Sequence, residues 1–90
     1  MSRLTRTFLI VNSLGLHARA AAQLVQTANR FRSEVLVEKD GTEVNGKSIM
    51  GVLTLAAAKG AQITVSTEGD DADAALTALA KVIENGFGEK

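Results

Sequence analysis

Segments with a strand-like hydrophobic period alternate with segments that have a helix-like period along this chain. This alternation restricts the fold more than any other feature of the sequence. Runs with apolar residues at every second position are typical of half-buried strands, whereas apolar residues three and four positions apart indicate one-sided helices. We predict strands at about residues 4–11, 34–39, 42–45 and 62–67, and helices at about residues 18–29, 48–58 and 70–84. The predicted order of elements is therefore βαββαβα.

The apolar faces of these elements predict the core. Along the strands we expect inward-pointing side chains at Phe8, Ile10, Val35, Val37, Ile63 and Val65. The first and last helices each carry one apolar stripe, made of Ala21, Leu24, Val25 and Ala28, and of Ala72, Ala75, Leu76, Leu79, Ala80 and Ile83. Elements that are apolar on one side only are typical of two layers, in which helices cover one face of a sheet and the other face is wet.

Glycine and aspartate mark where elements end. The Asp-Gly pair at residues 40–41 separates two alternating runs, which predicts a type I′ hairpin turn. Gly60 suits the left-handed conformation that closes a helix. We expect the Asp-Asp pair at residues 70–71 to cap the last helix, and residues 85–90 to form a loose tail.

The composition excludes several classes of function. The 90 residues carry ten basic and ten acidic side chains, so no net charge favours nucleic acid or an anionic membrane. The absence of cysteine excludes a disulfide framework and a thiolate metal site. No apolar run approaches the length that spans a bilayer, and the first residues lack the apolar core of a signal peptide. We therefore expect one domain over residues 1–90, in the cytoplasm, without a metal or cofactor.

The only histidine, His17, follows a predicted strand and a glycine turn and directly precedes a predicted helix. The first N–H groups of a helix have no intrahelical acceptor, and together with the helix dipole they form an anion site. The amides of Ala18 and Arg19, and the Arg19 guanidinium, would face an anion bound at this ring. A neutral imidazole is nucleophilic near neutral pH. We interpret His17 as a residue that carries a phosphoryl group, with Arg19 assisting.

Other interpretations of His17 are less specific. An isolated loop histidine often has no chemical role. One histidine without cysteines cannot fill a zinc shell. A hydrolytic triad with Ser13 would need a carboxylate to orient the ring, and no acidic residue lies close in sequence, although a distant one could fold in.

A second candidate site begins at Ser48, which suits the N-cap of the following predicted helix. Ile49, Met50 and Leu53 extend the apolar arc of that helix beyond what a small two-layer domain can bury. We interpret them as a docking patch for partner proteins, in which the flexible Met50 can repack. A phosphate on Ser48 would place negative charge beside this patch and weaken docking.

Two segments resemble the HPr family, the histidine-containing phosphocarrier proteins of the bacterial phosphoenolpyruvate-dependent phosphotransferase system. They are Gly-Leu-His-Ala-Arg at residues 15–19 and Lys-Ser-Ile-Met-Gly-Val at residues 47–52. The resemblance extends from Thr7 to about Ile83. It implies an α+β fold, an open-faced β-sandwich in which a four-stranded antiparallel sheet has three helices on one face.

The resemblance also implies a function. His17 would accept a phosphoryl group on Nδ1 from enzyme I and pass it to a IIA-type protein, with Arg19 assisting. Ser48 would be the regulatory serine, on which a kinase and a phosphorylase act in some members. The docking surface would consist of Leu16, Ile49, Met50 and Leu53. We expect a monomer, because His17 has to stay accessible to successive partners.

One residue departs from the family pattern. Ala20 stands where the family commonly has proline, which suits the first turn of a helix because its missing N–H would be unpaired anyway. Alanine is an excellent helix former, so we expect phosphoryl transfer to be retained. The form Gly-Leu-His-Ala-Arg-Ala resembles the nitrogen-related, regulatory branch of the family. A non-catalytic binding module switched at Ser48 is the alternative function.

Overall fold

The computed structural model describes residues 3–89 and has the predicted order of strands and helices. The strands are β1 (Arg3–Leu9), β2 (Glu34–Lys39), β3 (Thr42–Asn45) and β4 (Gln62–Glu68). The helices are α1 (Ala18–Ala28), α2 (Ile49–Thr54) and α3 (Ala72–Glu84), and a short 3-10 helix, η1, follows at Gly86–Gly88. The bounds of β2 and β3 are those predicted, whereas β1 ends two residues earlier, at Leu9.

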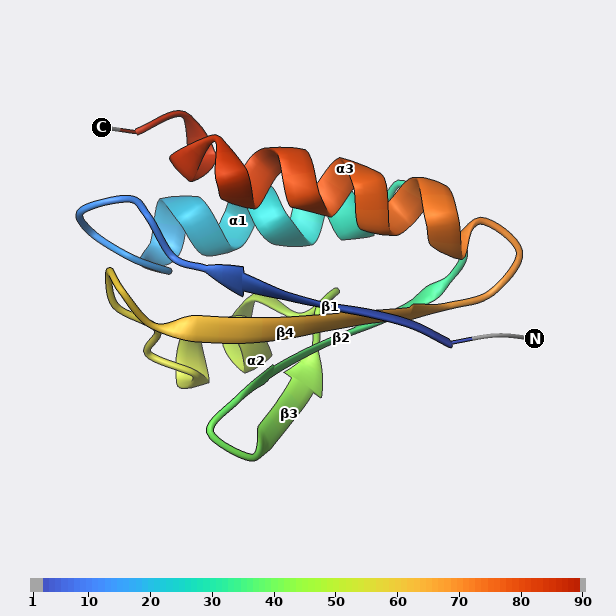
Figure 1. Ribbon diagram of the computed structural model, residues 1–90, viewed down its shortest axis with the longest axis horizontal. Coiled ribbons are helices and arrows are strands. Elements are labelled where there is room, and N and C mark those ends of the chain that lie inside the picture. The colour runs from blue at the N-terminus through green and yellow to red at the C-terminus, as the bar shows by residue number, and fades with distance from the viewer. Residues whose placement is uncertain (1–2, 90) are drawn as a thin grey trace.

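The four strands form one antiparallel sheet in the order β1-β4-β2-β3. β4 lies between β1 and β2, so the central pairings join segments that are far apart in sequence (Figure 1). β2 and β3 are joined by Asp40 and Gly41, whose φ angles of 52° and 86° are both positive, as the predicted type I′ turn requires. The predicted fold class, an open antiparallel sheet with three helices, is confirmed.

The helices and the sheet enclose one hydrophobic core. α1 and α3 lie side by side in Figure 1; α3 also contacts β1 and β4, and α2 contacts α1 and β3. All of the strand residues predicted to point inward are buried: Phe8, Ile10, Val35, Val37, Ile63 and Val65. None of the helices described for residues 3–89 has the length and apolar character needed to cross a bilayer.

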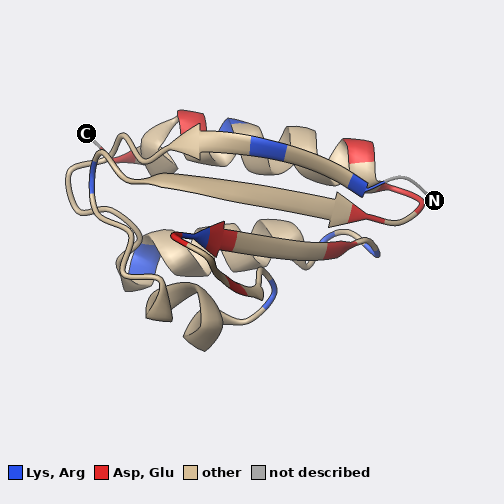
Figure 2. Cartoon of the chain, turned by 60° about the horizontal axis from the view of Figure 1, so that its bottom comes forward, with Lys and Arg blue, Asp and Glu red and all other residues tan. Residues whose placement is uncertain are grey.

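The uncovered face of the sheet is polar, as predicted. Hydroxyl groups pair across β1 and β4, Thr5 with Ser66 at 3.2 Å and Thr7 with Thr64 at 3.1 Å. Basic and acidic residues lie along the strands and at their ends in Figure 2.

α2 ends earlier than predicted, at Thr54 instead of about residue 58. Ala56 has a φ of 49°, which takes the backbone out of the helix. The carbonyl of Ala57 then accepts the N–H of Leu16 at 2.8 Å, so the segment after α2 anchors the loop in front of α1. Gly60, with a φ of 90°, has the predicted left-handed conformation, but in the turn into β4 rather than at a helix end.

The prediction of a loose tail is wrong for residues 85–89. Phe87, in η1, is 2% exposed, and its carbonyl accepts a hydrogen bond from the Gln23 side chain of α1 at 3.0 Å. The N–H of Glu89 donates to the carbonyl of Gly86 at 2.9 Å. Lys90 lies outside the described residues. The tail returns to the end of the molecule where the loop enters α1 (Figure 1).

The aspartate before α3 has a different role from the one predicted. Asp71 occupies the N-cap position, but its side chain does not cap the helix. Oδ1 accepts the N–H and the hydroxyl of Ser33 at 2.9 and 2.5 Å, and Oδ2 accepts the N–H of Arg32 at 2.9 Å. These bonds, the Ser33 hydroxyl first, lower the pKa of Asp71 to about 2. The carboxylate thus joins the turn before α3 to the loop after α1.

Candidate functional site

His17 is the N-cap residue of α1, as predicted, with an extended backbone (φ −75°, ψ −178°). Its carbonyl accepts the N–H of Ala21 at 2.8 Å, the first hydrogen bond of the helix. On the other side, the N–H of Gly15 donates to the carbonyl of Asn12 at 3.1 Å and closes a turn. The backbone is therefore held on both sides of the histidine.

The start of α1 is suited to an anion. Its first turn contains no acidic residue, and the His17 side chain does not cap it. The first N–H groups of a helix have no acceptor four residues earlier, and the helix dipole places positive charge at this end. Ala18 and Arg19 are exposed, whereas Ala20 is buried in the core.

The ring of His17 contacts an acidic residue that the sequence did not single out. Nε2 of His17 lies 2.6 Å from Oε2 of Glu89, a residue 72 positions later in the chain. The Asn12 side-chain amide donates to Oε1 of the same carboxylate at 2.9 Å. The side chains of His17 and Glu89 are 29% and 16% exposed, so the ring is accessible while its carboxylate partner is largely covered.

Three neighbours keep Glu89 ionised. The hydrogen bond from Asn12 is the largest cause that lowers the pKa of Glu89, while burial acts in the opposite direction. The hydrogen bond with His17 and the positive charges of His17 and Arg19 lower this pKa further. Arg19 therefore lies within electrostatic reach of the carboxylate that contacts the ring. The predicted pair of His17 and Arg19 is brought together around a third residue.

Comparison with known proteins decides the family. The family model described as "PTS HPr component phosphorylation site" matches residues 4–85. The chain belongs to the HPr family. It is 51% identical over 86 residues to phosphocarrier protein HPr of Neisseria meningitidis serogroup B, covering 96% of this chain and 97% of the relative. It is also 56% identical over 70 residues to the HPr-like protein Crh of Halalkalibacterium halodurans, covering 78% and 83%.

Solved HPr structures have the same fold. A crystal structure of HPr from Thermoanaerobacter tengcongensis superposes with a TM-score of 0.91 at 48% identity, covering 100% of this chain and 99% of that one. A structure described as an HPr dimer from the same organism superposes with a TM-score of 0.78 at 50% identity, covering 91% and 94%. The family resemblance predicted from two short segments is therefore confirmed over nearly the whole chain.

In this HPr-family chain Ser48 is the N-cap residue of α2, as predicted. Its hydroxyl accepts the N–H of Gly51 at 3.1 Å. Ile49 and Met50 are 42% and 75% exposed, which is the exposure that a docking patch needs. Leu53 is half-buried and packs partly against the core, so only part of its side chain is available.

Leu16 does not belong to an exposed docking surface, contrary to the prediction. Its side chain is 4% exposed and is part of the core. Leu14, two residues earlier in the same loop, is 69% exposed. A loop has no periodicity from which to read its inward and outward side chains, so the sequence could not separate the two leucines.

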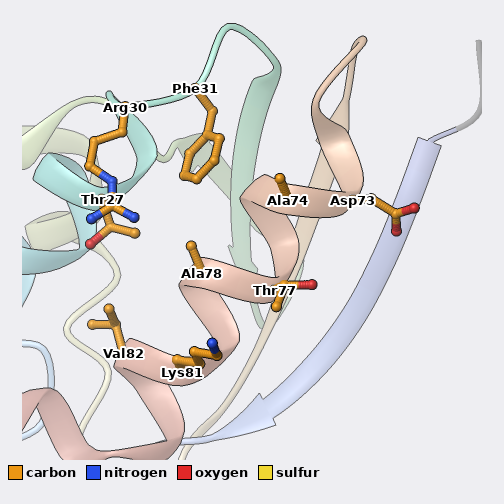
Figure 3. Close-up of a pocket in the computed structure, with 9 residues that line it drawn as sticks. All are labelled: Thr27, Arg30, Phe31, Asp73, Ala74, Thr77, Ala78, Lys81 and Val82. Atoms are coloured by element: carbon orange, nitrogen blue, oxygen red, sulfur yellow. The ribbon is translucent and has the colours of Figure 1, made fainter.

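A groove beside the HPr-family site is lined by Arg19 and Glu89, together with residues of α3, and has a volume of about 420 Å³. A larger groove of about 680 Å³ lies between α1 and α3, lined among others by Arg30, Phe31 and Thr77 (Figure 3). The larger groove includes neither His17 nor Glu89. The smaller groove, by contrast, includes Glu89, the carboxylate that contacts the His17 ring.

Proposed function

We propose that His17 accepts a phosphoryl group on Nδ1 from enzyme I and passes it to a IIA-type protein of a bacterial phosphotransferase system. The observation that carries this proposal is the position of His17, accessible at the start of α1 beside exposed Ala18 and Arg19. Membership of a family whose curated relatives are phosphocarrier proteins supports it.

In this function the chain is first an acceptor and then a donor. The lone pair on Nδ1 forms a bond to phosphorus as the bond between phosphorus and enzyme I breaks. The N–H groups of Ala18 and Arg19 and the Arg19 guanidinium face the negative charge of the transferred group. A helix end stabilises such a charge by about 0.3–1 kcal/mol. That modest value suits a carrier, because tight binding of the phosphorylated state would raise the barrier to onward transfer.

Both partners would dock on the exposed apolar side chains of α2. Ile49 and Met50 supply most of this surface, with the accessible part of Leu53. A kinase that phosphorylates Ser48 would add negative charge at the start of α2, next to that surface, and reduce docking. The chain would work as a monomer in the cytoplasm.

Phosphotransfer from purified enzyme I and phosphoenolpyruvate tests the proposal. The intact mass of the chain should rise by one phosphoryl group, and acid should remove it. The His17→Ala variant should gain nothing, whereas Gln26→Ala, an exposed position on the same helix, should behave as wild type. Phosphorylation of the His17→Ala variant under the same conditions would contradict the proposal. A panel of IIA-type proteins then identifies the acceptor.

A regulatory binding module switched at Ser48 is the second candidate function. It is favoured by the position of Ser48 directly before the exposed Ile49 and Met50. The Ser48→Asp variant should bind enzyme I and regulatory partners at least several-fold more weakly than Ser48→Ala, as measured by calorimetry. Equal binding of both variants would remove the support for a switch.

A further inference from the structure

We propose that Glu89 is a positioning residue for phosphoryl transfer, which holds the proton of the His17 ring on Nε2 and so leaves the lone pair on Nδ1. This inference rests on the proposed function of His17 and adds a residue to it from the C-terminal tail. Its basis is the geometry of the tail, the ring and the buried Asn12.

The contact itself sets the direction of the hydrogen bond. Oε2 of Glu89 lies 2.6 Å from Nε2 of His17, the distance of a short, charge-assisted hydrogen bond. An ionised carboxylate can only accept, so Nε2 has to carry the proton. A neutral imidazole has one protonated nitrogen, and Nδ1 is then the nucleophilic one. The carboxylate therefore selects between the two tautomers of the ring.

Asn12 holds the other oxygen of the carboxylate. Its amide nitrogen donates to Oε1 of Glu89 at 2.9 Å and to the carbonyl of Gly15 at 2.8 Å. Both partners are acceptors, so the orientation of this amide is determined. Asn12 is 1% exposed, which keeps water from competing for these bonds. Glu89 is thus tied to the same turn that leads into His17.

The tail that carries Glu89 is anchored at two further points. Phe87 is buried, and its carbonyl accepts a hydrogen bond from Gln23 of α1 at 3.0 Å. The N–H of Glu89 donates to the carbonyl of Gly86 at 2.9 Å. A side chain on such an anchored turn loses little further freedom when it contacts the ring. The anchored tail therefore holds the carboxylate of Glu89 in a defined place beside the His17 ring.

The charges around Glu89 support its role as an acceptor. His17 and Arg19 act on it from α1, and Lys81 of α3 lines the same groove. All of these groups are cationic or become so, and they favour the ionised carboxylate. Glu89 is the acidic side chain that lines this groove beside them.

The transfer step balances with the Nε2 proton in place throughout. As the bond from Nδ1 to phosphorus forms, the bond from phosphorus to the donor breaks and its electron pair returns to the donor. The His17 ring then carries phosphorus on Nδ1 and the proton on Nε2, and is positively charged. Glu89 offsets that charge. In onward transfer the bond to phosphorus breaks, its electron pair returns to Nδ1, and the ring is neutral again with its proton unmoved.

The test compares Glu89→Gln with Glu84→Gln, the same substitution on an exposed glutamate of α3 that pairs with Arg6 at 3.0 Å. Because His17 is the only histidine, nitrogen NMR of labelled protein shows one ring. Near pH 8 the wild type should show a protonated Nε2 and an unprotonated Nδ1. In Glu89→Gln, whose amide can pair with either tautomer, the two signals should move toward each other, while Glu84→Gln should match wild type.

The rate of phosphorylation by enzyme I should fall about threefold to tenfold in Glu89→Gln, less than for fully buried carboxylate partners of histidines because this pair is partly exposed. Glu89→Asp, which keeps the acceptor on a shorter side chain, should give intermediate ring signals. Unchanged ring signals in Glu89→Gln would overturn the positioning role, whatever the rate. If the wild type accepts no phosphoryl group, the proposed function fails, while the ring signals still decide whether Glu89 sets the tautomer.

Discussion

Replacing Gly15 with alanine tests how firmly the fold holds the backbone in front of His17. Gly15 has a φ of +65°, a conformation that side chains with a Cβ rarely adopt. An added Cβ would lie 2.3 Å from the carbonyl oxygen of Ala57 and 2.8 Å from Cα of Ala58. That carbonyl accepts the N–H of Leu16 at 2.8 Å. The loop and the segment after α2 therefore cannot stay in place together in this variant.

Three contributions set the size of the effect. The left-handed conformation costs an alanine about 1 kcal/mol. Loss of the hydrogen bond between Leu16 and Ala57 costs about 1 kcal/mol, and the displacement of packed backbone roughly another 1 kcal/mol. We therefore expect the free energy of unfolding of Gly15→Ala to fall by about 3 kcal/mol. For a domain of this size that lowers the melting temperature by roughly 12–24 °C.

The matched control is Gly41→Ala in the β2–β3 turn. Gly41 also has a positive φ, of 86°, but an added Cβ would meet nothing within 4 Å. Only the conformational contribution remains, about 1 kcal/mol. Urea denaturation followed by circular dichroism measures both variants. If Gly15→Ala is destabilised no more than Gly41→Ala, the close approach to Ala57 does not restrict this loop and the reasoning is refuted.

Three further predictions concern the tail, the acid stability and the oligomeric state. Phe87→Ala should lower the free energy of unfolding by about 3 kcal/mol, because a buried phenylalanine side chain is lost. Urea denaturation measures this change, and a decrease below about 1 kcal/mol would show that the tail packs weakly. The pKa of Asp71 is lowered from 3.8 to about 2, so its ionised form stabilises the fold above pH 3.8 and this contribution is lost as the pH falls toward 2. As the pH falls, the free energy of unfolding of Asp71→Asn should decline less than that of the wild type, because the variant has no carboxylate at this position to lose. Identical curves for the two proteins would contradict this account. Light scattering should give the monomer mass at all concentrations used for phosphotransfer; a stable dimer would refute the expectation that His17 serves its partners from a monomer.

The elements that the sequence predicted best are those whose ends are determined locally. In β2 the alternation of Val35 and Val37 stops at an Asp-Gly pair that makes its own turn. The strand, the turn and the next strand are therefore all encoded within about a dozen residues. The apolar stripes of α1 and α3 are also encoded locally, because the spacing of apolar residues within each helix determines which face turns toward the core.

The end of α2 could not be predicted because a distant hydrogen bond decides it. Residues 55–58 are leucine and alanine, which favour helix, and ending the helix before them gives up at most a few tenths of a kcal/mol of local preference per residue. The buried N–H of Leu16 needs an acceptor, and leaving it unpaired would cost about 1–3 kcal/mol. Ala57 supplies that acceptor from the segment that leaves the helix at Ala56. The larger contribution comes from the tertiary contact, and it overrides the local preference.

The tail was missed for a related reason. Phe87 is a single apolar residue between two glycines, and a single residue shows no period. Its burial depends on the end of α1 and α3 that it meets, and the contact of Glu89 with His17 depends on that burial. The sequence indicated only that a distant acidic residue could fold in beside His17, and the structure identifies that residue as Glu89.

Two features of the structure thus act on the same histidine, and Asn12 connects them because it donates both to the carbonyl of Gly15 and to Glu89. The turn at Gly15 and its contact with Ala57 fix where the backbone of His17 lies, while Glu89 fixes which ring nitrogen carries the proton. Gly15→Ala should therefore lower stability and displace the ring as a whole, whereas Glu89→Gln should change the ring signals with the start of α1 in place. If transfer is equally slow in both variants but the ring signals change only in Glu89→Gln, position and protonation each limit the reaction. If the two variants instead change the transfer rate and the ring signals in the same way, Glu89 only supports the loop before α1.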